Sequence, residues 1–247
     1  MSLESLHVVV TGGGSGVGAD VAKSLAKAGH KPTIMGRTES SLSEQGLPYQ
    51  VCDVTDAGAV DAAFANARVE QGPIHAVIAN AGAAESVPFH KMTADNLRAM
   101  VNVNLLGVFN VWKAALADMR QAGMGRLIAI ASTAGLKGYP YVAGYCAAKH
   151  GVVGLTRALA LEVAKTGITV NAVCPGFVDT PMLDRSIDTI VEKTGMSRDD
   201  ATASLAANSP QKRFVQTSEV ASAVLWLCSD AAKSVNGHTL SISGGEV

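Results

Sequence analysis

The chain has 247 residues, of which 48% are hydrophobic and 17% charged, so it carries enough apolar material for a folded core and is not a disordered protein. Its 20 Lys and Arg residues are balanced by 21 Asp and Glu residues, which argues against binding to nucleic acid or an anionic membrane, because both require a clustered positive surface. The chain opens without a basic leader and has no apolar run of the roughly 20 residues that span a membrane, so we expect a cytoplasmic protein.

Short β-branched runs alternate with longer helical patterns along the chain. Strands are predicted at residues 6–11, 31–35, 49–51, 74–79, 126–131, 168–174 and 238–242. Helices are predicted at residues 16–28, 57–71, 93–121, 144–165 and 218–228. Several strands are apolar throughout, which is typical of strands covered on both faces. The alternation predicts an α/β fold, a doubly wound Rossmann-type parallel sheet of about seven strands with helices on both faces, in a single domain spanning residues 1–247.

Two segments interrupt this alternation. Residues 38–47 leave room for at most about three helical turns, which is short for a crossover between parallel strands. Residues 180–214 form a long polar insertion, and long segments in compact domains are often lids over a ligand site. We therefore predict a substrate lid at residues 180–214, with a solvated pair of surface helices as the alternative.

The cysteines and histidines do not have the spacing of a metal site. The four cysteines are far apart in the sequence, at Cys52, Cys146, Cys174 and Cys228. We expect them to be buried reduced thiols. The six histidines are equally scattered, so no metal is predicted.

A glycine-rich turn follows the first predicted strand and leads directly into a helix. Its residues are Thr11, Gly12, Gly14, Ser15, Gly16, Val17 and Gly18, with a further glycine at position 13. Glycine permits the tight turn, the approach of the backbone to a pyrophosphate, and close packing of helix on strand. The free N–H groups at the start of the helix favour the bound anion. The strand–turn–helix context therefore predicts a dinucleotide-binding site.

The spacing Thr-Gly-x-x-x-Gly-x-Gly resembles the short-chain dehydrogenase/reductase family, in its compact single-domain branch. Ser132 lies 13 residues before Tyr145, and Lys149 follows four residues later, as the family's catalytic serine and Tyr-x-x-x-Lys pair do. Asn104 matches the family's active-site asparagine. Further matches extend the resemblance over nearly the whole chain, at positions where the family contacts its cofactor: Asp53, Val54, Asn80, Ala81, Gly82, Pro175, Gly176, Val178 and Thr180.

The candidate catalytic group combines two hydroxyls with a lysine. Tyr145 and Lys149 are four residues apart on a helix and share one face, and a nearby ammonium favours the phenolate, so we expect a lowered pKa for Tyr145. In the reductive direction Tyr145 donates a proton to a carbonyl oxygen, to which Ser132 also donates. The resemblance implies that Lys149 also binds the nicotinamide ribose. It further implies that Asn104 holds a water in a relay toward Lys149; a satisfied structural amide is the alternative.

His150 stands next to the candidate catalytic lysine. Adjacent helical residues point about 100° apart, so we expect His150 to face away from Tyr145 and to have a packing role.

The residues after the second predicted strand bear on the choice of cofactor. Enzymes that use NAD place a carboxylate there for the adenosine ribose, whereas this chain has Gly36. Arg37 follows, and its guanidinium suits a phosphate, to which Thr38 can add a hydroxyl donor. The pattern predicts NADP(H) in preference to NAD(H).

The predicted activity is an NADP(H)-dependent oxidoreductase that interconverts a small-molecule ketone and a secondary alcohol. The segments at residues 130–135, 149–154 and 166–182 resemble those of 3-oxoacyl reductases and polyketide ketoreductases. A 3-oxoacyl thioester (CoA more than carrier protein) is therefore the leading substrate. The alternative is a secondary alcohol dehydrogenase for cyclic or aryl ketones, which Tyr139 and Tyr141 would suit. A non-catalytic dinucleotide sensor is disfavoured by the intact Ser132, Tyr145 and Lys149. Lys137 is the one cation in the sequence near these residues, which makes a small free carboxylate a poor substrate.

Two predicted helices carry apolar residues on more than one face. They lie at residues 93–121 and 144–165 and include Phe109, Trp112, Leu155 and Leu159. One face can cover the sheet, and the rest needs a partner. Because the matching helices pair across a two-fold axis in the family, we predict a homotetramer.

Overall fold

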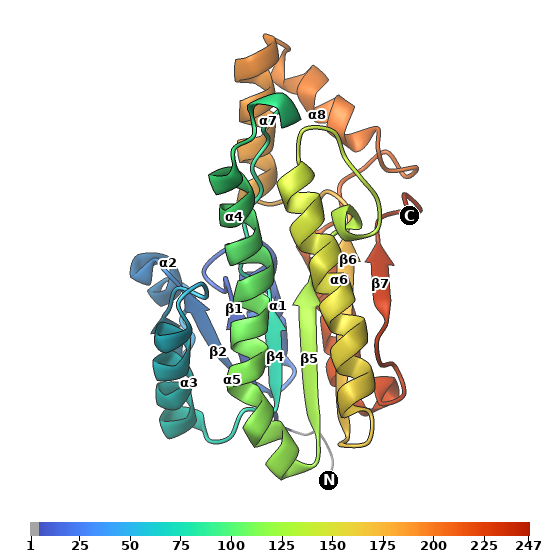
Figure 1. Cartoon of the computed structure of the whole chain (residues 1–247). Coiled ribbons are helices and arrows are strands. Elements are labelled where there is room, and N and C mark those ends of the chain that lie inside the picture. Colours follow the sequence, from blue (N-terminus) through green and yellow to red (C-terminus); the bar gives the residue numbers. More distant parts are fainter. Residues whose placement is uncertain (1–4) are drawn as a thin grey trace.

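The structure, a computed structural model, describes residues 5–247; residues 1–4, which the predicted domain includes, lie outside the described residues. Within residues 5–247, seven strands form one parallel sheet in the order β3-β2-β1-β4-β5-β6-β7 (Figure 1). The strands are β1 (His7–Thr11), β2 (Lys31–Gly36), β3 (Tyr49–Val51), β4 (Ala76–Ala79), β5 (Gly125–Ile130), β6 (Ile168–Pro175) and β7 (Thr239–Ile242). The predicted doubly wound Rossmann-type sheet is confirmed.

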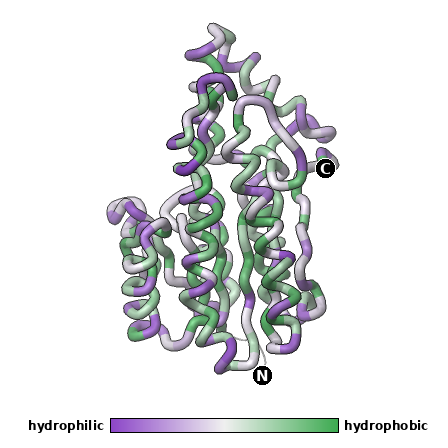
Figure 2. The backbone as a smooth tube through the Cα atoms, in the orientation of Figure 1, coloured by the Kyte–Doolittle hydropathy of each residue, from purple (hydrophilic) through white to green (hydrophobic). Residues whose placement is uncertain are grey.

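Helices cover both faces of the sheet and bury two separate cores. One face carries α3 (Ala57–Gln71), α5 (Gly107–Ala122) and α6 (Ala143–Val163), and the other carries α1 (Gly16–Lys27) and α9 (Thr217–Cys228). Successive strand side chains point to opposite faces, so β1 sends Val9 into the first core and Val8 and Val10 into the second. Figure 2 shows hydrophobic stretches along the strands in the middle of the molecule. This double burial explains the continuous apolar strands.

The helix predicted at residues 93–121 is interrupted. It consists of α4 (Ala94–Val101) and α5, joined by a π-helical turn at Asn102–Leu106. A capping box between Thr93 and Asn96 starts α4. The π turn holds Asn104, and such turns are frequent at functional sites. The predicted helical stretch at residues 93–121 is confirmed, but the sequence did not reveal the π turn within it.

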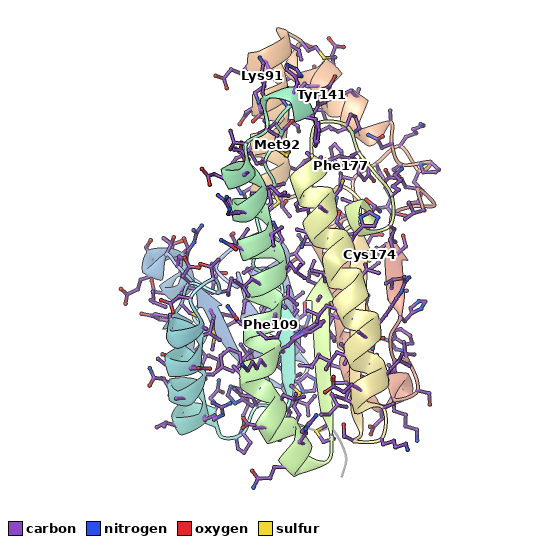
Figure 3. The ribbon with its side chains drawn as sticks, viewed as in Figure 1. Lys91, Met92, Phe109, Tyr141, Cys174 and Phe177 are labelled. Carbon is purple, nitrogen blue, oxygen red and sulfur yellow. The ribbon has the colours of Figure 1, made fainter. Side chains whose placement is uncertain are left out.

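The segment Ala94–Ala122 is long and apolar enough to cross a membrane by length and composition. However, Val111, Trp112 and Met119 are buried against the sheet, so this is a core helix. Of the apolar residues named on this helix, Trp112 covers the sheet, since its side chain is only 2% exposed. Phe109, 43% exposed, lies on the outer side of α5 (Figure 3).

The two irregular segments take different forms. The short crossover contains only α2 (Glu39–Ser43). The insertion forms α7 (Pro181–Thr194) and α8 (Arg198–Ala206), which lie together at the end of the molecule above β6 and β7 in Figure 1. Leu183, Ile187 and Ala201 form a small core of their own between these two helices. Short 3-10 turns occur at Phe89–Lys91, Thr133–Gly135 and Asp230–Ala232.

The four cysteines are free and buried, as predicted. Burial raises the pKa of the Cys52 and Cys174 thiols to about 11 and that of Cys228 to about 12, so these thiols stay protonated at neutral pH. Among residues 5–247, His, Cys, Asp and Glu form no group of three that could hold a metal ion.

Candidate active site

The predicted site residues gather at the carboxyl edge of the sheet. Thr11 ends β1, Asn80 follows β4, Ser132 stands two residues after β5, and Pro175 ends β6. All seven strands are parallel, so these ends meet at one edge, where open α/β sheets bind their ligands. The structure therefore brings together the residues that the sequence placed far apart.

The glycine-rich turn is fastened to the end of β4. The Thr11 hydroxyl accepts hydrogen bonds from the backbone N–H groups of Asn80 and Ala81, both at 3.0 Å. In return the Asn80 amide donates to the Thr11 carbonyl at 3.0 Å. A Cβ on Gly12 would lie 2.8 Å from the Asn80 amide nitrogen, and Gly12 has a φ of 65°. Thr11 and Asn80 thus use their polar atoms to position the turn.

The turn and the start of α1 fit an anionic group. Ser15 is the N-cap residue, and within the described residues its side chain makes no capping hydrogen bond; the first turn of α1 holds no acidic side chain. The free N–H groups and partial positive charge at this helix end suit a pyrophosphate. The Gln45 side chain braces the turn by donating to the carbonyls of Gly14 and Ser41, both at 3.0 Å. Gln45 was missed because its partner Gly14 is 31 residues away.

The adenine side of the site lies beyond β2 and β3. Arg37 and Thr38 are exposed immediately after Gly36. The Asp53 carboxylate accepts hydrogen bonds from the Thr55 backbone N–H at 2.9 Å and the Thr55 hydroxyl at 2.8 Å. These bonds, and secondarily the charge of Arg37, lower the pKa of Asp53. The ionised Asp53 and the exposed Arg37 guanidinium therefore lie close enough for their charges to interact.

The hydroxyls of Ser132 and Tyr145 meet beside a buried lysine. Ser132 caps the Thr133–Gly135 turn, its Oγ accepting from the Ala134 N–H at 3.0 Å, and its hydroxyl opposes the rise in the pKa of Tyr145. The Lys149 Nζ lies 5.6 Å from the centroid of the Tyr145 ring and donates to the Ile130 carbonyl at 2.8 Å. Burial lowers the pKa of Lys149 to about 8. The helical spacing of Tyr145 and Lys149 thus places both at the end of β5.

The expected lowering of the Tyr145 pKa is not found. Burial raises the pKa of Tyr145 to about 12, and the hydrogen bond with Ser132 only partly opposes this. Burial disfavours the phenolate, and the Lys149 ammonium is directed at the Ile130 carbonyl rather than at the phenol oxygen. Tyr145 is therefore protonated at neutral pH in this state, as a proton donor must be.

Asn104 is held in the π turn by backbone groups. Its amide nitrogen donates to the carbonyls of Ala83 at 2.8 Å and Met100 at 3.0 Å. Its amide oxygen accepts from the Ala83 N–H at 3.3 Å and lies 2.7 Å from where a Cβ on Gly82 would be. These contacts suit a structural amide, and the role in a proton relay stays a prediction.

The segment after β6 runs from the strand end to the insertion. The Gly176 N–H donates to the Ile242 carbonyl at 3.0 Å, and Val178 bridges to Val215. Thr180 is the N-cap residue of α7, and its methyl group lies 3.3 Å from the position of a Cβ on Gly16. The start of the insertion therefore lies against the glycine-rich turn, so that residues of the candidate nicotinamide and phosphate sites are in contact.

His150 lies on α6 next to Lys149, and Glu246 lies near the C-terminus. His150 faces away from Tyr145 as expected, but it is exposed and bonds through Nδ1 to the Cys146 carbonyl at 2.9 Å, so a packing role within the chain was wrong. Glu246, near the C-terminus, has a side chain only 2% exposed beside the loop after Ser132. Glu246 was also missed, because 107 residues separate it from its partner Tyr139.

Comparison with known proteins gives one consistent family. The short chain dehydrogenase family matches residues 6–191. The chain is 38% identical to a putative ketoacyl reductase of Streptomyces coelicolor over 98% of this chain and 97% of that protein. It is 35% identical to the 3-oxoacyl-[acyl-carrier-protein] reductase MabA of Mycobacterium tuberculosis, over 98% of this chain and 92% of the relative. Among solved structures, a variant of actinorhodin polyketide ketoreductase with NADPH superposes with a TM-score of 0.93 at 36% identity, covering 100% of this chain and 99% of that one.

Proposed function

Because this chain belongs to the short-chain dehydrogenase/reductase family, we propose that it is an NADP(H)-dependent ketoreductase that interconverts a ketone and a secondary alcohol. The observation that carries the proposal is the gathering of Ser132, Tyr145 and the buried Lys149 at the ligand-binding edge of the sheet, where Ser132 stands two residues after β5 and the Lys149 Nζ lies 5.6 Å from the centroid of the Tyr145 ring. The family as a whole uses a nicotinamide dinucleotide, and the glycine-rich turn fits its pyrophosphate.

Each group has a defined role in this proposal. When bound, the nicotinamide cofactor supplies the hydride. Tyr145, protonated at neutral pH, donates its proton to the carbonyl oxygen, while the Ser132 hydroxyl donates a hydrogen bond to the same oxygen as negative charge develops there. The charge of Lys149 would favour the phenolate left after the transfer, and Lys149 would also bind the nicotinamide ribose. Asn104 would hold a water in a relay toward Lys149.

Cofactor binding is proposed to use residues from five strand ends, those of β1, β2, β3, β4 and β6, together with Tyr145 and Lys149 on α6. The pyrophosphate would lie on the glycine-rich turn, with the adenosine beside Arg37, Thr38 and Asp53. The ribose and nicotinamide would lie along the remaining set, which is Asn80, Ala81, Gly82, Tyr145, Lys149, Pro175, Gly176, Val178 and Thr180. The exposed guanidinium of Arg37 next to Gly36 supports a preference for the 2′-phosphate of NADP(H). Steady-state kcat/KM for NADPH and NADH tests this, and a preference for NADH would contradict it.

A 3-oxoacyl thioester is the substrate we favour. Relatives named as ketoacyl reductases support it, and they align with this chain over nearly its full length. A carrier protein would need a basic docking patch, and the adjacent Lys212 and Arg213 are the candidate basic pair for it. The Arg213 guanidinium forms two bonds to the Glu219 carboxylate, at 2.6 and 2.8 Å, so its charge is balanced. This supports a CoA thioester over a carrier-bound one.

A cyclic or aryl ketone is the second candidate, and aromatic residues near the site support it. The Tyr139 and Phe177 rings pack edge to face with centroids 6.2 Å apart. Tyr141 is 62% exposed with a φ of 66°, and Figure 3 shows Tyr141 and Phe177 at the end of the molecule that carries α7 and α8. NADPH oxidation with acetoacetyl-CoA, a longer 3-oxoacyl-CoA, acetophenone and a cyclic ketone decides between the candidates. Turnover of the free ketones alone would overturn the thioester.

We also propose that α7 and α8 act as the lid over this site, in a cytoplasmic, single-domain homotetramer. The contact of Thr180 with the glycine-rich turn supports the lid, because closure there would cover the cofactor. The exposed side chains of Leu106 and Phe109 on the α5 side, and of Leu161 on α6, support an interface between copies. Light scattering at micromolar concentration tests the tetramer.

A further inference from the structure

The penultimate residue of the chain inserts a carboxylate between two loops of the candidate site. The Glu246 Oε1 accepts a hydrogen bond from the Tyr139 hydroxyl at 2.6 Å and lies 3.0 Å from the Lys137 ammonium. The Tyr139 hydroxyl also bonds to the Thr133 hydroxyl at 2.6 Å. We call Glu246, Tyr139, Lys137 and Thr133 the C-terminal cluster. It joins the chain end to the loop that follows Ser132.

The cluster is built around a buried charge. The Glu246 side chain is 2% exposed, whereas that of Lys137 is 37% exposed. A buried carboxylate is stable only with charged or hydrogen-bonding partners, and Glu246 has both. The Lys137 ammonium also lies 5.0 Å from the centroid of the Tyr139 ring. The charge of Lys137 is therefore neutralised from the protein side while its side chain still reaches solvent.

The C-terminal cluster adjoins the candidate site on two sides. Thr133 directly follows Ser132, one of the candidate catalytic residues. On the other side, a Cβ on Gly176, a candidate cofactor-binding residue, would lie 3.2 Å from the Glu246 Oε2. Figure 1 shows the C-terminus beside the loop that precedes α6, at the edge where the strands end. Lys137 therefore lies in the loop that adjoins the candidate site.

We propose that Glu246 is a specificity-determining residue that cancels the charge of Lys137 and so keeps the site selective for ketones without a negative charge near the carbonyl. The inference rests on the proposed ketoreductase function. An unpaired ammonium at this rim would attract oxo acids, and the buried carboxylate removes that attraction. A thioester of CoA remains compatible, because its phosphates lie far from the reacting carbonyl.

The test compares two probes of the same skeleton, 4-acetylbenzoate and its methyl ester. Glu246→Gln keeps a carbonyl oxygen that accepts from Tyr139 but removes the charge, so Lys137 becomes unpaired. We expect the acid-to-ester ratio of kcat/KM to rise by about two- to fivefold, mainly through KM for the acid, as for a partly exposed ion pair. The gain should shrink with added salt. Adding Lys137→Gln to this variant should abolish the gain.

The outcomes separate this inference from the proposed function. An unchanged ratio, or an equal loss for both probes, would make Glu246 a merely structural residue and overturn the inference. Calorimetric binding of 4-acetylbenzoate to the protein with NADP⁺ gives a readout without turnover. Should the wild type reduce neither probe nor any ketone or thioester of the substrate panel, the proposed function fails, while tighter binding of 4-acetylbenzoate by Glu246→Gln still supports the inference and unchanged binding overturns it. If Glu246→Gln does not fold, Lys137→Gln provides the test. The Glu246 carboxylate is then unpaired and repels an anion, so this variant should bind 4-acetylbenzoate more weakly than the wild type, and unchanged binding overturns the inference.

Discussion

Gly18→Ala should destabilise the protein although alanine is the better helix former. Gly18 is the third residue of α1 and is buried. A Cβ there would lie 2.5 Å from the Asn80 amide nitrogen and 2.8 Å from the Gly12 carbonyl carbon, and still closer to the Gly12 oxygen. Real Cβ atoms essentially never approach other atoms within 3.0 Å, and two of these three atoms are backbone. The helix or the glycine-rich turn must therefore move.

The size of the effect follows from two opposing contributions. Alanine in a helix interior gains about 1 kcal/mol over glycine. Overpacking costs about 1–3 kcal/mol, and the upper value applies here because backbone atoms cannot rotate away. The net loss in the free energy of unfolding is about 2 kcal/mol. A domain of this length loses roughly 2–4 °C in Tm per kcal/mol, so Tm should fall by about 4–8 °C.

Gly58→Ala is the matched control, since Gly58 is an exposed helical glycine of α3. A Cβ there would contact only the Asp56 carboxylate, at an ordinary 3.4 Å. Urea denaturation and thermal melting should therefore show Gly58→Ala to be as stable as the wild type or slightly more stable. Because displacement of the turn also disturbs the pyrophosphate site, the Kd for NADPH should rise in Gly18→Ala and not in Gly58→Ala. A Gly18→Ala protein as stable as its control would refute this account of the turn.

The remaining predictions concern proton transfer, pH and assembly. Tyr145→Phe should lower kcat at least a hundredfold, the usual scale of acid catalysis, with NADPH affinity almost unchanged; Lys149→Ala should impair both. Retention of most activity by Tyr145→Phe would contradict its assignment. Burial lowers the pKa of His7 below its unfolded value of about 6.5, so the unfolded chain binds the proton more readily and stability should fall as the pH drops below about 6.5. Urea titrations across this range should show a shallower fall in His7→Gln. Phe109→Asp should shift the light-scattering mass from tetramer to smaller species, and an unchanged mass would exclude this surface as the interface.

The sequence by itself determined the fold and most of the candidate site. Strand and helix periodicities are local, and they placed every strand boundary within two residues of the structure. The glycine spacing after β1 and the four-residue step from Tyr145 to Lys149 are also local patterns. Ser132 follows β5 and Tyr145 lies near the start of α6, the next long helix, so the predicted succession of strand and helix placed both at the carboxyl edge of the sheet.

Only the tertiary structure decided the properties that depend on burial and distant partners. The π turn at Asn102–Leu106 preserves the apolar pattern of its helix, so periodicity could not reveal it. The raised pKa of Tyr145 results mainly from burial, which exists only in the folded chain. Glu246 meets Tyr139 across 107 residues, and neither residue carries a local signal of the other. Spacing along a chain encodes neighbours on one element, whereas desolvation and charge pairing arise only when the elements pack.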